Sequence, residues 1–197
     1  GAGANSRVAI DDLKRVNGLI SSAAVGVLNF EIPIPVVIEA AGRFRRTGAK
    51  VVLNLSPLFP LPAELLPLVD LLIVNEIEAA SVVGDMADPG VLLPRIRSLG
   101  IPDVVITLGS AGAIFTDGVA ARAIAGHSVD VVDPTAAGDA FLGTLVAGLA
   151  ADLSMLEASL RANVAGALTV SRPGAQPSIP NQVEIDKALA LWSGVSV

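Results

Sequence analysis

The stretch "VDVVDPTAAGDAFLGTLVAGLA", residues 129–150, contains three aspartates, and the last of them, Asp139, lies where small residues give way to a long apolar run. The apolar run predicts a helix beginning near Ala136, and backbone N–H groups at a helix N-terminus bind anions. The small side chains of residues 136–138 would let an anion approach this backbone closely. A carboxylate at this point has two explanations, a helix N-cap or a base beside a bound anion.

The second explanation predicts phosphoryl transfer. Asp139 would repel a phosphate that merely lay beside it, unless a substrate hydroxyl lay between the two groups. Such a hydroxyl could lose its proton to Asp139 while it attacks the phosphoryl group, with preorganised N–H dipoles stabilising the developing charge. A carboxylate and an anion-binding backbone together therefore favour a kinase.

Several other polar residues fall at the ends of predicted strands, namely Glu31, Asn54, Asn75, Thr107 and Asp133. Ligands of parallel sheets bind beyond the carboxyl ends of the strands, which lie along one edge. Any one of these residues could instead be a helix N-cap or a turn residue. Their appearance after successive strands favours a shared ligand site.

The chain contains no familiar nucleotide-binding loop. "GAGAN" at the start is not a GxGxxG sequence, and "GSAG" at 109–112 is too short for a Walker loop. None of the three lysines, Lys14, Lys50 and Lys187, lies in a glycine loop. A bound phosphate must therefore be held by backbone N–H groups, as expected at residues 136–138.

Strand-like and helix-like segments alternate along the chain. The predicted strands are 23–30, 49–56, 70–75 and 103–107, with a hairpin over 112–124 that turns at Asp117-Gly118. The predicted helices are 35–48, 62–69, 76–84, 89–100, 136–151, 155–171 and 182–193, and residues 171–182 form a loop. This order predicts βαβ units and a three-layer, doubly wound α/β fold with a mostly parallel sheet.

The composition limits the classes of protein. Hydrophobic residues make up 52%, but prolines and acidic residues interrupt the most apolar stretch, 51–75, so a buried parallel sheet explains it better than a membrane helix. The net charge of −6, without a basic stripe, argues against a nucleic-acid surface. The absence of cysteine excludes disulfides and thiolate zinc sites. Since no signal-peptide pattern is present, we expect a cytoplasmic protein.

Four segments resemble motifs of the ribokinase-like (PfkB) sugar kinases. They are "NEIEAASVVG" (75–84), "VVITLGSAGA" (104–113), "DPTAAGDAF" (133–141) and "RPGAQPSIP" (172–180), with further similarity in "GAGAN" and "LNFEIP". The resemblance covers essentially the whole chain. The combination of AAGD and GAQPSIP favours the ribokinase type over the adenosine kinase and fructokinase types.

The resemblance implies an ATP-dependent kinase that transfers the γ-phosphate to the 5-hydroxyl of D-ribose, without nucleic-acid or membrane partners. Two alternatives remain open. One is another kinase of the family, of the fructokinase, nucleoside kinase or ketodeoxygluconate kinase type. The other is a truncated, non-catalytic nucleotide-binding module.

The resemblance also implies roles for individual residues. Asp139 would be the base, the N–H groups of Ala136, Ala137, Gly138 and Asp139 the anion hole, and Glu31 a sugar contact. Asn75 and Glu78 would lie near the ATP phosphates and Mg²⁺, with Glu78 acting through water. Thr107, Gly109, Gly112 and Gly138 would line the nucleotide, and Asn163 would lie near the adenine.

A monovalent cation site is implied as well. Asp133, the carbonyls of Thr135, Thr169, Arg172 and Gly174, and the Ser178 hydroxyl would surround the ion. A shell of oxygen atoms with one carboxylate suits K⁺. The ion would brace the loop that presents the anion hole.

Each role has a simpler structural counterpart. Glu78 could be a solvated residue in the first turn of a helix, and Asn163 could face solvent in the middle of one. Asp133 could be an ordinary turn residue before a proline, and Glu31 could cap the helix after it. The only histidine, His127, has no partner pattern, which favours a structural role.

The sequence departs from the family pattern in two ways. Pro134 replaces the usual threonine, and proline lacks an N–H, but this position precedes the anion-hole amides. The family also places sugar-binding segments, lid strands and its usual homodimer contact before the point at which "GAGAN" begins. We therefore expect residues 1–197 to form a single ribokinase-like α/β domain, incomplete at its N-terminal side and without a lid. This chain alone would then be weakly active or inactive.

Overall fold

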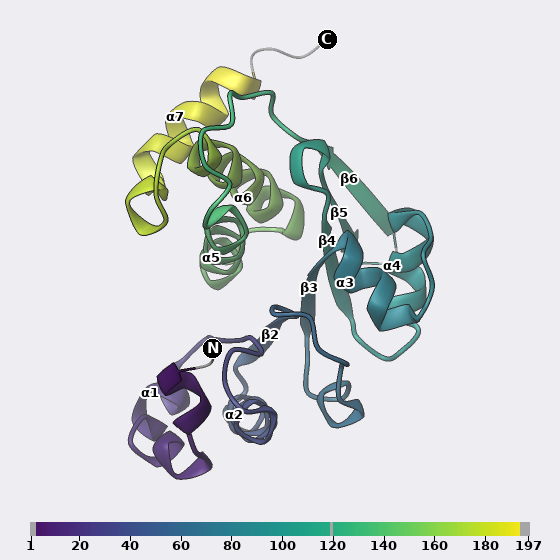
Figure 1. Ribbon diagram of the computed structural model, residues 1–197, viewed down its shortest axis with the longest axis vertical. Coiled ribbons are helices and arrows are strands. Elements are labelled where there is room, and N and C mark those ends of the chain that lie inside the picture. The colour runs from purple at the N-terminus through teal and green to yellow at the C-terminus, as the bar shows by residue number, and fades with distance from the viewer. Residues whose placement is uncertain (1–2, 119, 194–197) are drawn as a thin grey trace. The chain divides into compact units, whose positions relative to one another are not determined.

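A computed structural model describes residues 3–118 and 120–193 (Figure 1). The first two residues of "GAGAN" lie outside the described residues. The chain divides into two compact units. Unit 1 comprises Gly1–Thr107 and Ile114–Ala121, and unit 2 comprises Leu108–Ala113 and Arg122–Val197. The single domain expected over 1–197 stays a prediction.

The central element is a six-stranded sheet with the strand order β1-β2-β3-β4-β5-β6. The strands are β1 Val25–Leu28, β2 Lys50–Asn54, β3 Leu71–Asn75, β4 Asp103–Thr107, β5 Gly112–Asp117 and β6 Ala120–Ala125. The first four are parallel neighbours, with Leu28 opposite Leu53 and Leu71 opposite Asp103 in the register. The interior of β2 is fully buried, as expected for a parallel strand covered on both faces. The predicted α/β fold with a mostly parallel sheet is confirmed.

Helices connect the parallel strands of unit 1. They are α2 Ile34–Thr47, α3 Glu76–Val83 and α4 Pro89–Arg97, and they pack on β1 and β2, on β3, and on β4 respectively. The predicted ranges 35–48 and 76–84 both end on a glycine, and these glycines, Gly48 and Gly84, end α2 and α3 with left-handed φ values of 81° and 73°. Such a conformation favours glycine.

One helix prediction for unit 1 is wrong, and one region of helical turns has no counterpart among the predictions. The helix predicted over 62–69 is only a 3-10 turn, η3 Ala63–Leu65. Pro67 explains the difference, since proline has no N–H to continue a helix. No element is predicted before residue 23, where the structure has two 3-10 helices, η1 Gly3–Arg7 and η2 Ile10–Lys14, and the short helix α1 Asn17–Ser22. They bury only Leu13 and Ile20, too few apolar residues to produce a periodic pattern.

Unit 2 consists mainly of helices, which are α5 Ala137–Ala150, α6 Met155–Val170 and α7 Gln182–Ser193, with the short turns η4 Gly109–Ala111 and η5 Gln176–Ser178. α5 and α6 lie side by side in Figure 1 and approach closely. A Cβ on Gly148 would lie 3.0 Å from the Ala158 Cβ. Ala140, Val164, Ala165, Ile185 and Ala188 join the three helices in one core.

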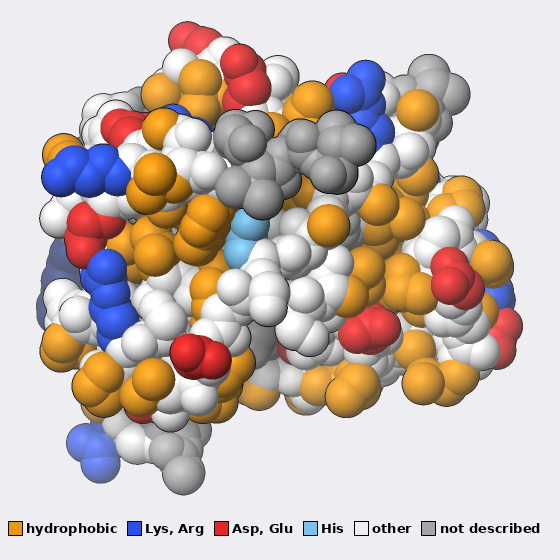
Figure 2. Space-filling view, turned by 90° about the horizontal axis from the view of Figure 1, so that it is seen from above, with side chains coloured by type: hydrophobic (Ala, Val, Ile, Leu, Met, Phe, Trp, Pro, Cys, Tyr) orange, Lys and Arg blue, Asp and Glu red, His pale blue; other side chains and the backbone are white. Residues whose placement is uncertain are grey.

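Hydrophobic side chains are common on the surface, where they lie among the charged ones (Figure 2). Exposed examples include Leu19, Ile77, Met86, Val131 and Leu191. Over the described residues, none of the helices has both the length and the apolar character needed to span a bilayer.

Candidate functional site

The start of α5 leaves its backbone uncapped. Ala136 occupies the N-cap position in a left-handed conformation, with φ 63° and ψ 7°, and no side chain caps the helix. A left-handed alanine is uncommon, because its Cβ crowds the backbone. Asp139 lies in the first turn and is exposed, and its carboxylate makes no hydrogen bond within the described residues. The N-cap explanation of Asp139 is therefore wrong.

The amides at this helix start are mostly free. The Ala137 N–H donates to the Pro134 carbonyl over a long 3.4 Å, and the Ala140 N–H makes the first full helical bond, 2.9 Å to the Ala136 carbonyl. Among the described residues, the N–H groups of Gly138 and Asp139 find no protein acceptor. Unsatisfied N–H groups at a helix start attract anions. This arrangement fits the predicted anion hole.

The Asp133 carboxylate connects two segments that are far apart in the sequence. Its Oδ1 accepts from the Thr135 N–H at 2.9 Å and its Oδ2 from the Gly174 N–H at 3.0 Å. Hydrogen bonds from Thr135 and from the Gly174 backbone hold the pKa of Asp133 below its usual value. Asp133 is thus more than an ordinary turn residue, because it fixes the loop before α5 against the loop after α6.

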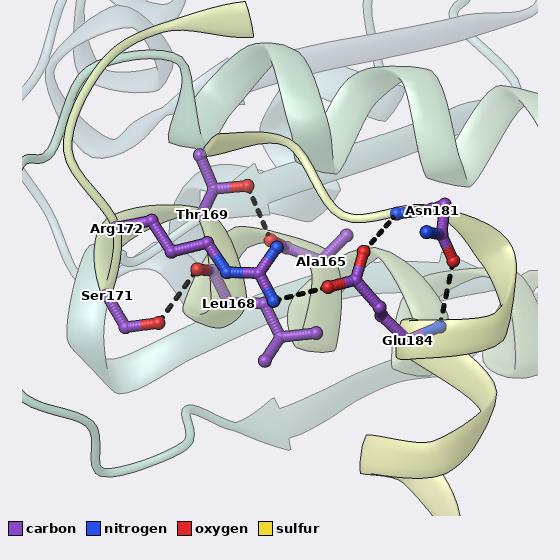
Figure 3. Close-up of polar contacts among 7 residues, drawn as sticks. All are labelled: Ala165, Leu168, Thr169, Ser171, Arg172, Asn181 and Glu184. Atoms are coloured by element: carbon purple, nitrogen blue, oxygen red, sulfur yellow. Dashed lines mark hydrogen bonds and ion pairs between the residues drawn. The ribbon is translucent and has the colours of Figure 1, made fainter. Parts of the chain in front are cut away.

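The loop between α6 and α7 is held at both of its ends (Figure 3). Arg172 Nη2 contacts Glu184 Oε1 at 2.6 Å, while Glu184 Oε2 accepts from the Asn181 N–H at 2.9 Å. The Asn181 backbone, followed by the Arg172 side chain, lowers the pKa of Glu184. The Thr169 hydroxyl donates to the Ala165 carbonyl at 2.8 Å. The segment that carries the predicted K⁺ ligands is therefore constrained.

The predicted K⁺ ligands are partly brought together by these contacts. Asp133, Thr135 and Gly174 are directly linked, and the Arg172 N–H donates to the Thr169 carbonyl at 3.2 Å. Ser178 is fully buried, and its hydroxyl donates to the Ala175 carbonyl at 2.6 Å. In the part of the chain that the structure describes, no three His, Cys, Asp or Glu side chains are grouped so that they could hold a metal ion. One carboxylate with carbonyl and hydroxyl oxygens fits a monovalent cation better than a transition metal.

In unit 1, the start of α3 is closed by a capping box. The Asn75 Oδ1 accepts from the Glu78 N–H at 2.9 Å, and the Glu78 Oε2 accepts from the Asn75 N–H at 2.8 Å. Glu78 is only 7% exposed, and burial raises its pKa although the Asn75 backbone bond opposes the shift. The interpretation of Glu78 as a solvated residue is wrong. Because its oxygen is engaged, Asn75 can offer a phosphate only its side-chain N–H groups.

Two further predicted residues lie at the carboxyl ends of strands in unit 1. Glu31 follows β1 and is exposed, and its N–H donates to the Asn29 Oδ1 at 3.2 Å. It does not cap α2, whose N-cap is Pro33. Thr107 ends β4, and its hydroxyl contacts the Val74 carbonyl at 3.4 Å.

The remaining nucleotide candidates belong to unit 2. Gly112 has φ 102°, and a Cβ there would lie 2.1 Å from the Ile124 carbonyl, so close backbone packing requires this glycine. Gly109 has φ 57° and open space around it. Asn163 is buried and its Nδ2 donates to the Ala125 carbonyl at 2.7 Å. The interpretation of Asn163 as a solvent-facing residue is therefore wrong.

Three features of unit 2 have no signal in the local sequence pattern. The left-handed Ala136 carries no sequence signal, since alanine rarely adopts that conformation. The resemblance implied that Asp133 and Gly174 share one site, but the direct bond from the Gly174 N–H to the Asp133 carboxylate spans too much sequence for any local pattern to predict it. His127 stacks on Trp192 with ring centroids 4.2 Å apart, and burial lowers its pKa. The structural role expected for His127 agrees with this contact.

The predicted site residues thus fall into two groups. Unit 1 holds Glu31, Asn75, Glu78 and Thr107, while unit 2 holds Gly109, Gly112, Asp133, Thr135, Ala136, Ala137, Gly138, Asp139, Asn163, Thr169, Arg172, Gly174 and Ser178. Within unit 2, a carboxylate and free amides share one helix start. Such a group can accept a proton beside a bound anion.

Comparison with known proteins gives a consistent picture. Residues 19–182 match the model of the pfkB family carbohydrate kinases. The chain is 35% identical to a ribokinase of Staphylococcus aureus over 193 residues, which is 94% of this chain and 62% of that protein. It is 37% identical over 188 residues to a bifunctional ribokinase/ribose-5-phosphate isomerase A of Fructilactobacillus sanfranciscensis, covering 93% of this chain and 35% of that protein.

Solved structures agree with the sequence matches. A ribokinase from Thermotoga maritima superposes with a TM-score of 0.88 at 27% identity, over 96% of this chain and 64% of that one. An Arabidopsis thaliana ribokinase complexed with ribose and ATP gives a TM-score of 0.87 at 28% identity, over 96% of this chain and 63% of that one. The chain therefore spans less than two thirds of the length of these relatives.

Proposed function

We propose, from the premise that this chain belongs to the pfkB family of carbohydrate kinases, that it carries the catalytic base and the nucleotide side of an ATP-dependent ribose kinase. Its reaction would transfer the γ-phosphate of ATP to the 5-hydroxyl of D-ribose, giving ribose 5-phosphate and ADP. The observation that carries this proposal is the open start of α5, where Asp139 lies beside amides that have no protein acceptor.

The similarity to ribokinases supports ribose as the acceptor. The chain is 35% identical to the S. aureus ribokinase and 37% identical to the bifunctional enzyme. A solved relative is described as holding ribose and ATP. Another kinase of the family, acting on a different small alcohol, remains the second candidate. The aminoimidazole riboside kinase of Salmonella enterica, 25% identical with a TM-score of 0.72, illustrates that alternative.

In the proposed reaction Asp139 takes the proton from the 5-hydroxyl as that oxygen attacks the γ-phosphorus. The bond between the γ-phosphorus and the bridging oxygen of ADP breaks, and ADP leaves with the electron pair. The amides at 136–139 hold the negative charge that develops on the transferred group. Asp139 is suited to this role because it is exposed and not engaged as a cap.

Binding roles follow for the other candidates. Glu31 would accept hydrogen bonds from sugar hydroxyls, and the side-chain amide of Asn75 would donate to a phosphate oxygen. Thr107, Gly109 and Gly112 would line the nucleotide, with Gly112 fixed in place by its approach to Ile124. Asn163 would act near the adenine by holding the end of β6 through Ala125.

Two ions complete the proposal. Mg²⁺ supplies charge neutralisation for the ATP phosphates, and the buried Glu78, with one oxygen already hydrogen-bonded, suits contact through water only. Asp133 and the oxygens near Gly174 would hold K⁺ and so fix the loop that precedes α5. The homodimer and the cytoplasmic location stay predictions from the sequence.

Product analysis tests the proposal directly. The purified 197-residue chain is incubated for a long period with ATP, Mg²⁺, K⁺ and D-ribose, and ³¹P NMR follows the products. We expect slow formation of ribose 5-phosphate with ADP in equal amount. The reason is that Glu31 and Asp139 alone would orient the sugar, whereas full orientation of two reactants can lower a barrier by roughly 7–11 kcal/mol. ATP binding without any phosphorylated sugar would favour the non-catalytic nucleotide-binding module instead.

A further inference from the structure

Phe30, the residue that precedes Glu31 in unit 1, forms an aromatic pair with Phe59. The rings of Phe30 and Phe59 meet edge to face, with centroids 6.0 Å apart and planes at 75°. Phe30 directly precedes Glu31 in the loop after β1, and Phe59 lies in the loop after β2. β1 and β2 are parallel neighbours, so both loops leave the same edge of the sheet. Ligands of parallel sheets bind at this edge.

The position of Phe59 is fixed by a buried neighbour. Phe30 is only 8% exposed, and its N–H donates to the Ser56 carbonyl at 2.9 Å, which joins the two loops. Edge-to-face contact is a favoured geometry for aromatic rings. The ring of Phe59 is therefore held in place although 48% of the residue remains exposed. A ring that is both positioned and exposed is suited to contact with a ligand.

The surroundings combine apolar and polar groups in the way that a sugar requires. A sugar has hydroxyl groups around its rim and C–H groups on its faces, so its site needs an apolar surface with a few polar groups. The Glu31 carboxylate makes no hydrogen bond within the described residues, so it is available to accept from hydroxyls. Phe59 offers the apolar surface.

We propose that Phe59 forms the apolar wall of the acceptor site, with its ring against a C–H face of the pentose whose hydroxyls bond to Glu31. Phe59 thereby determines specificity for the sugar, and Phe30 is a positioning residue that holds it. This inference rests on the proposed function, and it adds a residue that none of the four resemblance motifs contains.

Ribose binding by the 197-residue chain tests the inference. Saturation-transfer difference NMR detects weak binding and shows which sugar protons lie against the protein. We expect Phe59→Ala to weaken the apparent D-ribose affinity about tenfold, on the scale of an aromatic contact. Phe59→Tyr keeps the ring and should stay within about twofold of the unsubstituted chain. ATP affinity should be unchanged in both variants, and Phe59→Ala should lower Tm only by about 2–4 °C, the scale of the lost ring contact with Phe30.

Leu58 provides a matched control, because it is the adjacent residue and is 49% exposed against 48% for Phe59. Leu58→Ala should leave ribose affinity unchanged. Equal ribose affinity in Phe59→Ala and the unsubstituted chain would overturn the role of Phe59 while leaving the proposed function intact. If light scattering shows that the unsubstituted chain self-associates, and Phe59→Ala abolishes this without changing ribose binding, Phe59 contacts protein and its proposed role at the sugar is wrong.

Two further outcomes distinguish a failure of the role of Phe59 from a failure of the proposed function. If the unsubstituted chain shows no saturable ribose signal and forms no ribose 5-phosphate, the proposed function and the role of Phe59 both fall. If adenosine binds more tightly than ribose, and Phe59→Ala removes only that difference, the ring contacts a base and the assignment to the sugar face is wrong.

Discussion

The first turns of α3 and α5 each contain a carboxylate, Glu78 in α3 and Asp139 in α5, but the two carboxylates differ in burial and in hydrogen bonding. Glu78 is buried and exchanges hydrogen bonds with Asn75, so this start is closed. Asp139 is exposed, caps nothing, and follows a left-handed Ala136.

This difference separates a structural carboxylate from one that is available for chemistry. A capping box satisfies N–H groups and stabilises its helix. At α5 the free amides and the left-handed Ala136 lower stability, a cost typical of functional sites. The resemblance motifs assigned functions to both starts, and only their contacts distinguish them.

The largest expected effect comes from neutralising the free carboxylate. Asp139→Asn should lower ribose-dependent ADP formation by roughly 10²-fold or more, the scale of a general base. ATP affinity should remain nearly unchanged, because the amides are retained. A coupled ADP assay and calorimetric ATP titration measure the two quantities.

Asp130→Asn is the matched control, since Asp130 is an exposed acid shortly before the same helix. Its ADP formation should equal that of the unsubstituted chain. Full activity in Asp139→Asn would contradict the assignment of Asp139 as the base, and the starts of α3 and α5 would then no longer differ in function.

A substitution in the capping box of α3 should change the stability of the protein. Glu78→Ala removes half of the capping box and should lower the free energy of unfolding by about 1–2 kcal/mol, measured by urea denaturation. Glu76→Ala alters an exposed acid in the same turn and should cost less than about 0.5 kcal/mol. Equal losses in the two variants would contradict a specific role for the Glu78 contacts.

The pH dependence of protein stability gives a second test of the Glu78 contacts. Burial raises the pKa of Glu78 above its ordinary value of 4.5, so the folded protein holds this proton more tightly than the unfolded chain does. The contribution of Glu78 to stability is therefore full below pH 4.5 and declines as the pH rises through the raised pKa. Glu78→Gln should lack this decline, so Tm values of the two proteins between pH 4 and 7 should diverge.

An intermediate effect is expected from K⁺ at the loop before α5. Replacing a bulky organic cation by K⁺ at equal ionic strength should raise Tm by about 2–4 °C, because a bound ion stabilises the folded state. Asp133→Asn should abolish the increase, since it removes the charge that the ion would contact. Asp130→Asn again serves as the control and should keep it. Identical Tm values in the two salts would count against the cation site.

The smallest effect concerns the backbone of the open start. Ala136→Gly should raise the free energy of unfolding by about 0.5–1 kcal/mol, because glycine adopts the left-handed conformation without crowding. Ala147→Gly, in the exposed interior of α5, should lower it by about 1 kcal/mol. A destabilised Ala136→Gly protein would show that Ala136 is not strained.

Elements with strong local signals were predictable from the sequence. β3 and β4 begin and end within one residue of their predicted bounds, since both are short apolar runs. Gly48 and Gly84 end their helices as predicted. The helix predicted over 62–69 failed because its apolar residues suggested a helix while Pro67 removes an N–H that a helix needs.

The sequence by itself determined the α/β alternation, the position of Asp139 at a helix start and the segments from which the site is drawn. Periodicity, glycine and proline act over a few residues, so sequence shows their effects directly. Only the tertiary structure decided that Glu78 is buried in a capping box, that Asp133 reaches Gly174, and that Phe59 meets Phe30. Burial and contacts between distant segments depend on how strands and helices pack, and no local pattern encodes them.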